Sequence, residues 1–183
     1  VQEPALHGAE GLLDLAEIPV AVVHLGGAEL VFPQVGLYGV AAVEGLGTAA
    51  AVGTGWYHSC AVTTSGALAC WGKNNLGQLG DGGTTNHAFP VTVASLSGVA
   101  GVTGGTAHTC AWLDDGKAWC WGDNNVGQLG NGKGTAGLVE KKPVQVIGLD
   151  DVVHMAAGAS HTLAVRKDGT VWAWGDPTWG GLG

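Results

Sequence analysis

The chain has 183 residues, a formal net charge of −8 and only 12% charged residues. A surface that binds nucleic acid needs clustered lysine and arginine against phosphate, so this acidic balance argues against that class of protein. The apolar fraction of 46% is too high for a disordered chain, and no apolar run is long enough to predict membrane insertion.

The first segment, residues 1–39, is the least regular part of the chain. A degenerate hairpin can be aligned from Val20 to Phe32, with Ala21 and Val31 facing each other across a turn at Gly27. The alternative is a capping segment that is unrelated to the rest. Because the chain has no initiator methionine and stops partway through a motif, we expect a processed piece or part of something longer.

A 23-residue unit then occurs three times, at residues 58–80, 108–130 and 161–183. Its middle copy is HTCAWLDDGKAWCWGDNNVGQLG, in which a turn glycine separates two strand-like runs. A period of about fifty residues predicts a repeat architecture. The predicted strand pairs are Ser59–Thr63 with Ala67–Trp71, Thr109–Leu113 with Lys117–Trp121, and Thr162–Arg166 with Thr170–Trp174.

An apolar run begins 18 residues before each repeated histidine, at Val40, Pro90 and Pro143. We expect this run to be the outer strand of its repeat, followed by a second strand near Val99–Val102 or Val152–Ala156. Four strands in about fifty residues are typical of one propeller blade. The sequence therefore predicts a single repeat domain over residues 1–183, with blades at 40–89, 90–142 and, truncated, 143–183.

These motifs resemble a known family. Trp-Gly followed by Asn-Asn-x-Gly-Gln-Leu-Gly, a Pro-Val-x-Val run and an Ala-Ala-Gly-x-x-His stretch are similar to the RCC1-type repeat, over roughly Val40 to Gly183. The resemblance implies an all-β β-propeller, which has seven blades in the founding member. Three clear blades and one degenerate blade then imply part of a propeller or of an assembly.

The four cysteines form two pairs, each spaced by ten residues around a hairpin turn: Cys60 with Cys70, and Cys110 with Cys120. Directly opposite positions of an antiparallel pair are close enough for a disulfide. The third repeat has lost both members together. The alternatives are buried reduced thiols or a zinc site, although the usual short ligand spacing is missing. Disulfides indicate an oxidising compartment, so we expect an extracellular or cell-surface location, or the periplasm.

No motif predicts catalysis, and we expect no enzyme activity, cofactor or metal. The run from Gly127 to Lys133 matches the start of a P-loop, but Gly134 follows where serine or threonine is required. The column of His58, His108 and His161 is interpreted as hydrogen-bonding histidines that satisfy loop backbone. The aspartates before the turn glycines are interpreted as turn residues, and a calcium loop at Asp123 lacks its later ligands.

The sequence therefore predicts a non-catalytic protein–protein interaction module that binds a protein partner or further copies of itself. Known roles of such families include nucleotide exchange on a small GTPase, chromatin docking and inhibition of a β-lactamase. The alternatives are a structural subunit of a cell-surface or filamentous assembly and an accessory domain of a larger enzyme. Recognition is expected in the two loops that vary most, Asp81–Phe89 and Asn131–Lys142, unless these are merely solvated. The candidate contact residues are Lys133, Glu140, Lys141, Lys142, His87 and Phe89.

Overall fold

The computed structural model describes residues 20–25, 28–33 and 42–183. The fold divides the chain into two units, Val1–Ala42 and Val43–Gly183, whereas the sequence predicted one repeat domain. The segment before residue 43 lacks the Gly-Gln-Leu-Gly sequence that follows the first two repeated hairpins. Within the described ranges, no helix is both long enough and apolar enough to cross a membrane.

In the described residues of the first unit, β1 (Val20–Leu25) pairs antiparallel with β2 (Ala28–Pro33). Val31 lies opposite Val22 and not opposite Ala21, so the register differs by one residue from the alignment with the repeats. Two residues separate the last paired positions here, Leu25 and Ala28, whereas five residues separate the last paired positions of the first repeated hairpin, Val62 and Leu68. The different turn length changes the register. The remainder of residues 1–39 lies outside the described residues.

The second unit contains three repeated hairpins at the positions that the sequence predicted. Their turns use the predicted chemistry: Gly116 has a φ of 79°, and Oδ1 of Asp115 accepts the backbone N–H of Lys117 at 3.0 Å. Asp168 accepts from the N–H of Thr170 in the same way. The paired strands are β4 (His58–Thr63) with β5 (Leu68–Gly72), β8 (His108–Leu113) with β9 (Ala118–Asp123), and β12 (His161–Arg166) with β13 (Val171–Gly175).

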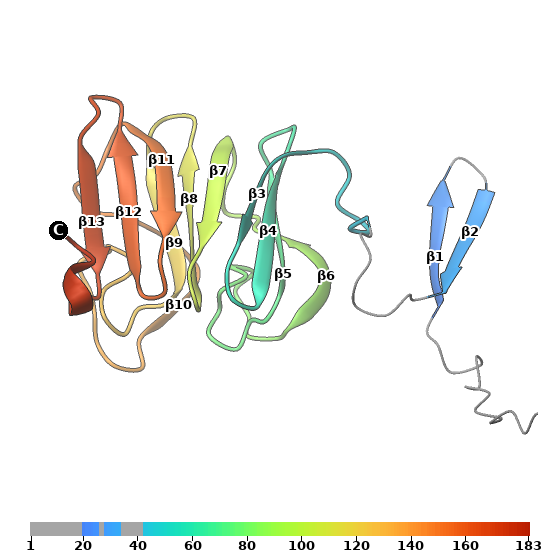
Figure 1. Ribbon diagram of the computed structural model, residues 1–183, viewed down its shortest axis with the longest axis horizontal. Helices are drawn as coiled ribbons and strands as arrows, with labels where there is room; N and C mark the ends of the chain where they lie inside the picture. Colours follow the sequence, from blue (N-terminus) through green and yellow to red (C-terminus); the bar gives the residue numbers. More distant parts are fainter. Residues whose placement is uncertain (1–19, 26–27, 34–41) are drawn as a thin grey trace, which may run out of the picture. The chain divides into compact units, whose positions relative to one another are not determined.

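These hairpins extend into three antiparallel sheets, which Figure 1 shows side by side with the second sheet in the middle. The order is β3-β4-β5-β6 in the first sheet, β7-β8-β9-β10 in the second and β11-β12-β13 in the third. The inner strands come before each hairpin: β3 (Ala49–Thr54), β7 (Val99–Gly104) and β11 (Val152–Ala157). The outer strands come after it: β6 (His87–Thr92) and β10 (Val139–Gln145).

The predicted grouping of the outer strand was wrong. Pro90 and Val91 belong to β6, and Val91 pairs with Cys70 of the preceding hairpin. The Pro-Val-x-Val strand therefore completes the sheet before it, so the sheets are offset from the predicted blades 40–89 and 90–142. Each outer strand pairs with the strand that precedes it in the chain, as sequential strands commonly do. The sequence repeat gives the length of one unit but does not show at which residue a sheet begins.

Both outer strands are irregular at their proline. The register shifts between Gly72↔His87 and Cys70↔Val91 in the first sheet, and in the second between the partners of Glu140 and Val144. Proline has no N–H to donate to a ladder, so it is tolerated at an edge or a bulge. A bulge at the edge bends the strand and discourages further pairing.

The apolar core lies between neighbouring sheets. Leu68 of the first sheet, with Leu79 and Val93 from its connecting segments, packs against Val102 and Trp121 of the second sheet. Leu129 and Val146, from the segments that flank β10, similarly pack against Met155 and Ala164, with Trp174 alongside. The repeated tryptophans Trp121 and Trp174 therefore pack between neighbouring sheets.

Candidate functional site

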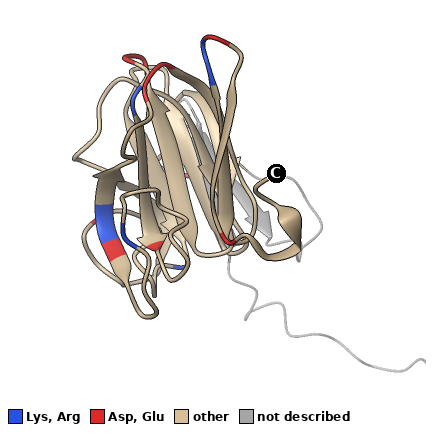
Figure 2. Cartoon of the chain, turned by 90° about the vertical axis from the view of Figure 1, so that its left-hand side faces the viewer, with Lys and Arg blue, Asp and Glu red and all other residues tan. Residues whose placement is uncertain are grey.

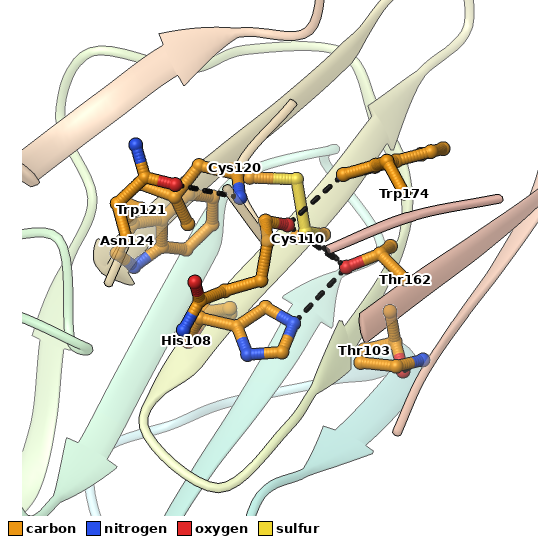
Figure 3. Close-up of a disulfide and its surroundings, with 12 residues drawn as sticks. Thr103, His108, Cys110, Cys120, Trp121, Asn124, Thr162 and Trp174 are labelled. Atoms are coloured by element: carbon orange, nitrogen blue, oxygen red, sulfur yellow. Dashed lines mark hydrogen bonds between the residues drawn. A yellow bond between two sulfur atoms is a disulfide. The ribbon is translucent and has the colours of Figure 1, made fainter. Parts of the chain in front are cut away.

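A chain of hydrogen bonds connects the second sheet to the third. Nε2 of His108 lies 3.0 Å from Oγ1 of Thr162. The Thr162 hydroxyl donates to the carbonyl oxygen of Gln128 at 3.0 Å, and Nε1 of Trp174 donates to the same oxygen at 2.9 Å. Figure 3 shows His108 directed at Thr162 beside the Cys110–Cys120 disulfide. The second sheet thus supplies an imidazole and a loop carbonyl, while the third supplies a hydroxyl and an indole.

The same arrangement connects the first sheet to the second. Nε2 of His58 lies 2.8 Å from Oγ1 of Thr109, whose hydroxyl donates to the carbonyl of Gln78 at 2.7 Å. Nε1 of Trp121 donates to that carbonyl at 2.9 Å. We call each set of four groups (histidine, hydroxyl, loop carbonyl and indole) an inter-sheet relay.

The relay fixes the tautomer of its histidine. The threonine hydroxyl has one hydrogen, which it donates to the carbonyl, so it can only accept from the imidazole. Nε2 must therefore carry the hydrogen, and Nδ1 is left as an acceptor. Nδ1 of both His58 and His108 is buried without a hydrogen-bond partner among the described residues.

Burial also keeps these histidines neutral. Loss of solvation lowers the pKa of His58 and of His108 from 6.5 to about 4, since the charged form is disfavoured away from water. For His108, the neighbouring imidazoles of His58 and His161 lower the pKa further. A buried imidazole that is already bonded at Nε2 cannot reach a substrate as a general base. We therefore interpret the relay as a structural contact between neighbouring sheets.

A glycine three residues before each relay histidine makes room for the ring. A Cβ at Gly105 would lie 2.2 Å from Cε1 of His108 and 2.5 Å from the carbonyl oxygen of Gly158. A Cβ at Gly55 would lie 2.1 Å from Cε1 of His58. The Gly-x-x-His spacing thus follows from ring packing against bare backbone.

The sequence analysis correctly predicted that His58 and His108 form hydrogen bonds, but it predicted the wrong partner. The imidazoles contact a threonine of the next sheet and not loop backbone. The sequence analysis missed Thr109 and Thr162, because their role appears only when two sheets are stacked. The available signal was a hydroxyl residue after every repeated histidine, Ser59 included.

The predicted disulfides are confirmed. Cys60 lies opposite Cys70 in the ladder and is bonded to it, and Cys110 is bonded to Cys120 in the same way. All four side chains are buried, and no free cysteine occurs in the part of the chain that the structure describes. The zinc and free-thiol alternatives are thereby contradicted.

The predicted partner-binding segments are only partly loops. Glu140, Lys141 and Lys142 lie in β10, and His87 and Phe89 lie in β6. The charged residues before Pro143 do not form a typical strand pattern, but charged residues and proline are favoured in strands at the edge of a sheet. The prediction of loops up to residues 89 and 142 was therefore wrong at their C-terminal ends.

The two segments do lie side by side, as expected for the same position in neighbouring blades. The backbone N–H of Gly82 donates to the carbonyl of Lys141 at 3.0 Å. A Cβ at Gly82 would lie 2.9 Å from Cε of Lys142, so the lysine side chain covers this glycine. We call the combined surface, made of residues 81–89 and 131–142, the loop face.

The loop face mixes paired and exposed side chains. Nζ of Lys133 lies 3.8 Å from Glu140, and Nε2 of His87 lies 3.2 Å from Asp81. Lys141, Lys142 and Phe89 are exposed. Figure 2 shows that the charges gather in loops at the ends of the strands and on one outer strand. Exposed ion pairs contribute little to stability, so these residues are available for contacts.

The loops after the first two Trp-Gly pairs are held by buried asparagines. Oδ1 of Asn124 accepts the N–H of Leu129 at 3.1 Å, and Nδ2 of Asn124 donates to Asn131 at 2.9 Å. Asn74 holds Leu79 in the same way at 3.0 Å. These bonds occupy the Asn124 side chain, which a calcium loop beginning at Asp123 would direct at its ion. Within the described ranges, no group of three or more His, Cys, Asp or Glu residues could hold a metal.

Comparison with known proteins identifies related sequences. A model described as "Regulator of chromosome condensation (RCC1) repeat" matches residues 65–112 and 115–165, and a second with that description matches residues 49–78 and 99–128. The ultraviolet-B receptor UVR8 of Arabidopsis thaliana is 42% identical over 134 residues, which cover 72% of this chain and 30% of UVR8. The human E3 ubiquitin-protein ligase HERC2 is 36% identical over 127 residues, which cover 68% of this chain and 3% of HERC2.

Solved structures share the fold. Human WBSCR16 superposes with a TM-score of 0.63 at 22% identity, covering 81% of this chain and 36% of its own. Prp20p of Saccharomyces cerevisiae superposes with a TM-score of 0.61 at 23% identity, covering 81% and 33%. At these identities the likeness concerns the fold alone. It confirms the predicted all-β class, with sheets that match the blades of an RCC1-like propeller.

Proposed function

This chain belongs to the family of regulator of chromosome condensation (RCC1) repeats, and we propose that it is a non-catalytic protein-interaction module. One observation carries the proposal. The residues that repeat between sheets are buried in cores, disulfides and relays, while the residues that vary, such as Lys142 and Phe89, are exposed on the adjacent strands and loops of the loop face. Variable segments on a rigid scaffold are frequent binding sites.

Proteins of similar fold support this class of function. Yeast RCC1 (Prp20) has been crystallised bound to Kap60, and Prp20p has binding properties toward Gsp1p and histones. Because this chain spans 30% of UVR8 and 3% of HERC2, the activities of those whole proteins are not transferred to it. What is transferred is the use of RCC1 blades as a surface for another protein.

The chemistry of the loop face indicates the kind of partner. Lys133, Lys141 and Lys142 make up three of the seven basic residues of an otherwise acidic chain. A complementary partner would present carboxylates to these lysines and an apolar position to Phe89. Such charges select partners and accelerate encounter more than they add affinity.

We place this interaction outside the cytosol. Both disulfides lie within single hairpins and are buried. Disulfides persist in oxidising compartments, which supports an extracellular or cell-surface location, with the periplasm as a second possibility.

An experiment that removes the lysine charges of the loop face tests the proposal. Lys133, Lys141 and Lys142 are replaced by serine, and the matched control replaces the chain's other three lysines, Lys73, Lys117 and Lys167. The two variants have the same net charge, and each should unfold within about 0.5 kcal/mol of wild type, because surface substitutions rarely matter more. Proteins captured by cross-linking from extract of the source organism are then quantified by mass spectrometry.

The comparison distinguishes binding through the loop face from a general effect of net charge. We expect a specific captured protein to be lost with the loop-face variant and retained with the control. Equal capture by all three proteins would place recognition elsewhere on the chain.

A further inference from the structure

Asp81 and Asn131 occupy the same position in the first and second sheets. Each stands ten residues after the tryptophan of its Trp-Gly pair, and each is followed directly by a glycine. Oδ1 of Asp81 accepts the side-chain N–H of Asn74 at 3.0 Å and the backbone N–H of Gly83 at 2.9 Å. A carboxylate at this position is therefore held by two donors of its own loop.

Asn131 is held by the corresponding pair of donors. Its Oδ1 accepts the side-chain N–H of Asn124 at 2.9 Å and the backbone N–H of Lys133 at 3.1 Å. An amide oxygen and a carboxylate oxygen are thus bound alike in the two loops. The fold at this position accepts aspartate as well as asparagine.

The second polar atom of the two side chains faces opposite kinds of partner. Oδ2 of Asp81 lies 3.2 Å from Nε2 of His87, which can donate to it. Nδ2 of Asn131 instead donates to Oε1 of Glu140 at 3.4 Å. An amide beside Glu140 is a favourable contact, whereas a carboxylate in its place would bring two negative charges together.

Asn131 also carries the chemistry of an asparagine that can lose its amide. It is the only asparagine of the sequence that precedes a glycine. The backbone nitrogen of the next residue can attack the side-chain amide carbon and close a five-membered ring, and glycine obstructs this attack least because it has no side chain. The attack places negative charge on Oδ1, which the N–H groups of Asn124 and Lys133 stabilise.

We propose that Asn131 is a site of spontaneous deamidation, and that the aspartate formed there loosens the segment 131–142. The nitrogen of Gly132 forms a bond to Cγ of Asn131, the bond from Cγ to Nδ2 breaks, and ammonia leaves with the proton of the Gly132 N–H. Water then opens the succinimide at either carbonyl, which gives aspartate or isoaspartate.

The charge of the product changes the contacts of this segment. The aspartate product keeps the two donors of its Oδ1, as Asp81 does, but its second oxygen replaces the amide that faced Glu140. Repulsion between the two carboxylates then separates residue 131 from β10, in which Glu140 lies. The modification adds negative charge beside the lysines of the loop face.

Mass spectrometry of the folded protein tests the reaction. After incubation at pH 8 and 37 °C, the peptide with Asn131 should gain about 1 Da, as both aspartate and isoaspartate. Asn75 and Asn125 are internal controls that should stay unchanged, because both are more exposed than Asn131 but neither precedes a glycine. An Asn131 that stays intact in the folded protein, while it converts in protein unfolded by urea, would overturn the proposal.

Trypsin cleavage after the exposed Lys133 tests the loosening. Asn131→Asp should be cleaved at least about tenfold faster than wild type, since proteolysis follows the population of the open segment. Asn131→Asp with Glu140→Gln should return to the wild-type rate, and Glu140→Gln alone is the matched control that should also be cleaved at that rate. Equal cleavage of wild type and Asn131→Asp, or no recovery in the double variant, would overturn the proposed role of Glu140. Neither measurement requires a partner, so both are independent of the proposed binding function.

Discussion

Nε2 of His108 is hydrogen-bonded to Oγ1 of Thr162, a residue 54 positions away in the next sheet. The same bond joins His58 to Thr109. In both cases the threonine hydroxyl also donates to a loop carbonyl, so the bonds form a connected network of buried groups. Such networks favour one arrangement of the packed sheets because every member has a specified partner.

The stability of the protein should fall as the pH falls from 7.5 to 5. His58 and His108 have a pKa of about 4 when folded and near 6.5 when unfolded. The unfolded chain therefore binds more protons in this window, and stability that is complete above pH 6.5 is lost on the way down to pH 4. Each histidine should cost roughly 2 kcal/mol between pH 7.5 and 5. Urea unfolding at the two pH values measures the difference.

The titration of Asp81 does not contribute to the change in stability between pH 7.5 and pH 5. The pKa of Asp81 is lowered by backbone and side-chain hydrogen bonds that outweigh its burial, so it stays ionised at pH 5. A double variant, His58→Gln with His108→Gln, keeps a donor for each threonine but removes the titrating group. It should lose less stability on acidification than wild type does. A wild type that is equally stable at pH 5 and pH 7.5 would contradict the prediction.

Gly105→Ala should destabilise the protein strongly. The added methyl group would overlap the His108 ring and the Gly158 carbonyl, and backbone cannot yield as a flexible side chain can. We expect a loss of at least about 2 kcal/mol in the free energy of unfolding. Gly83→Ala is the control, because its nearest neighbour, Asp81, is 3.5 Å away and ordinary contact results. Equal stability of the two variants would show that the histidine is not packed as described.

The cysteines should be fully oxidised in protein from its native compartment. Alkylation of the denatured, unreduced protein should add no mass, whereas prior reduction should allow four additions. Replacing Cys110 and Cys120 together by alanine should cost less than about 3 kcal/mol, because the closed loop is short. Four reactive thiols before reduction would refute the disulfides.

Local patterns made the hairpins predictable. Alternating apolar residues around Gly116, with a cysteine on each side, indicate both the strands and their register. The partner of the next strand was not predictable in this way. Val91 could pair with the hairpin before it or the one after it, and only the packed fold decides between them.

Neither the relay nor the edge strand β10 could be predicted from the sequence, for related reasons. Nothing in one repeat shows that His108 meets Thr162, since that contact requires two stacked sheets. Lys141 and Lys142 looked like loop residues because charge is uncommon in a strand, yet β10 is an edge strand that faces solvent. Conversely, the paired cysteines were predicted correctly, because both members of each pair lie in one hairpin.

Whether the relay holds neighbouring sheets together is tested most directly by a double-mutant cycle on His108→Ala and Thr162→Val. The free energies of unfolding of wild type, both single variants and the double variant are measured at pH 7.5. The same cycle with His108→Ala and Thr63→Val is the control, since Thr63 bonds only locally to Ser65 and Ala67. We predict a coupling of about 1 kcal/mol or more for His108 with Thr162, and additivity within about 0.5 kcal/mol for the control. Additive effects of His108 and Thr162 would contradict a relay that connects the sheets.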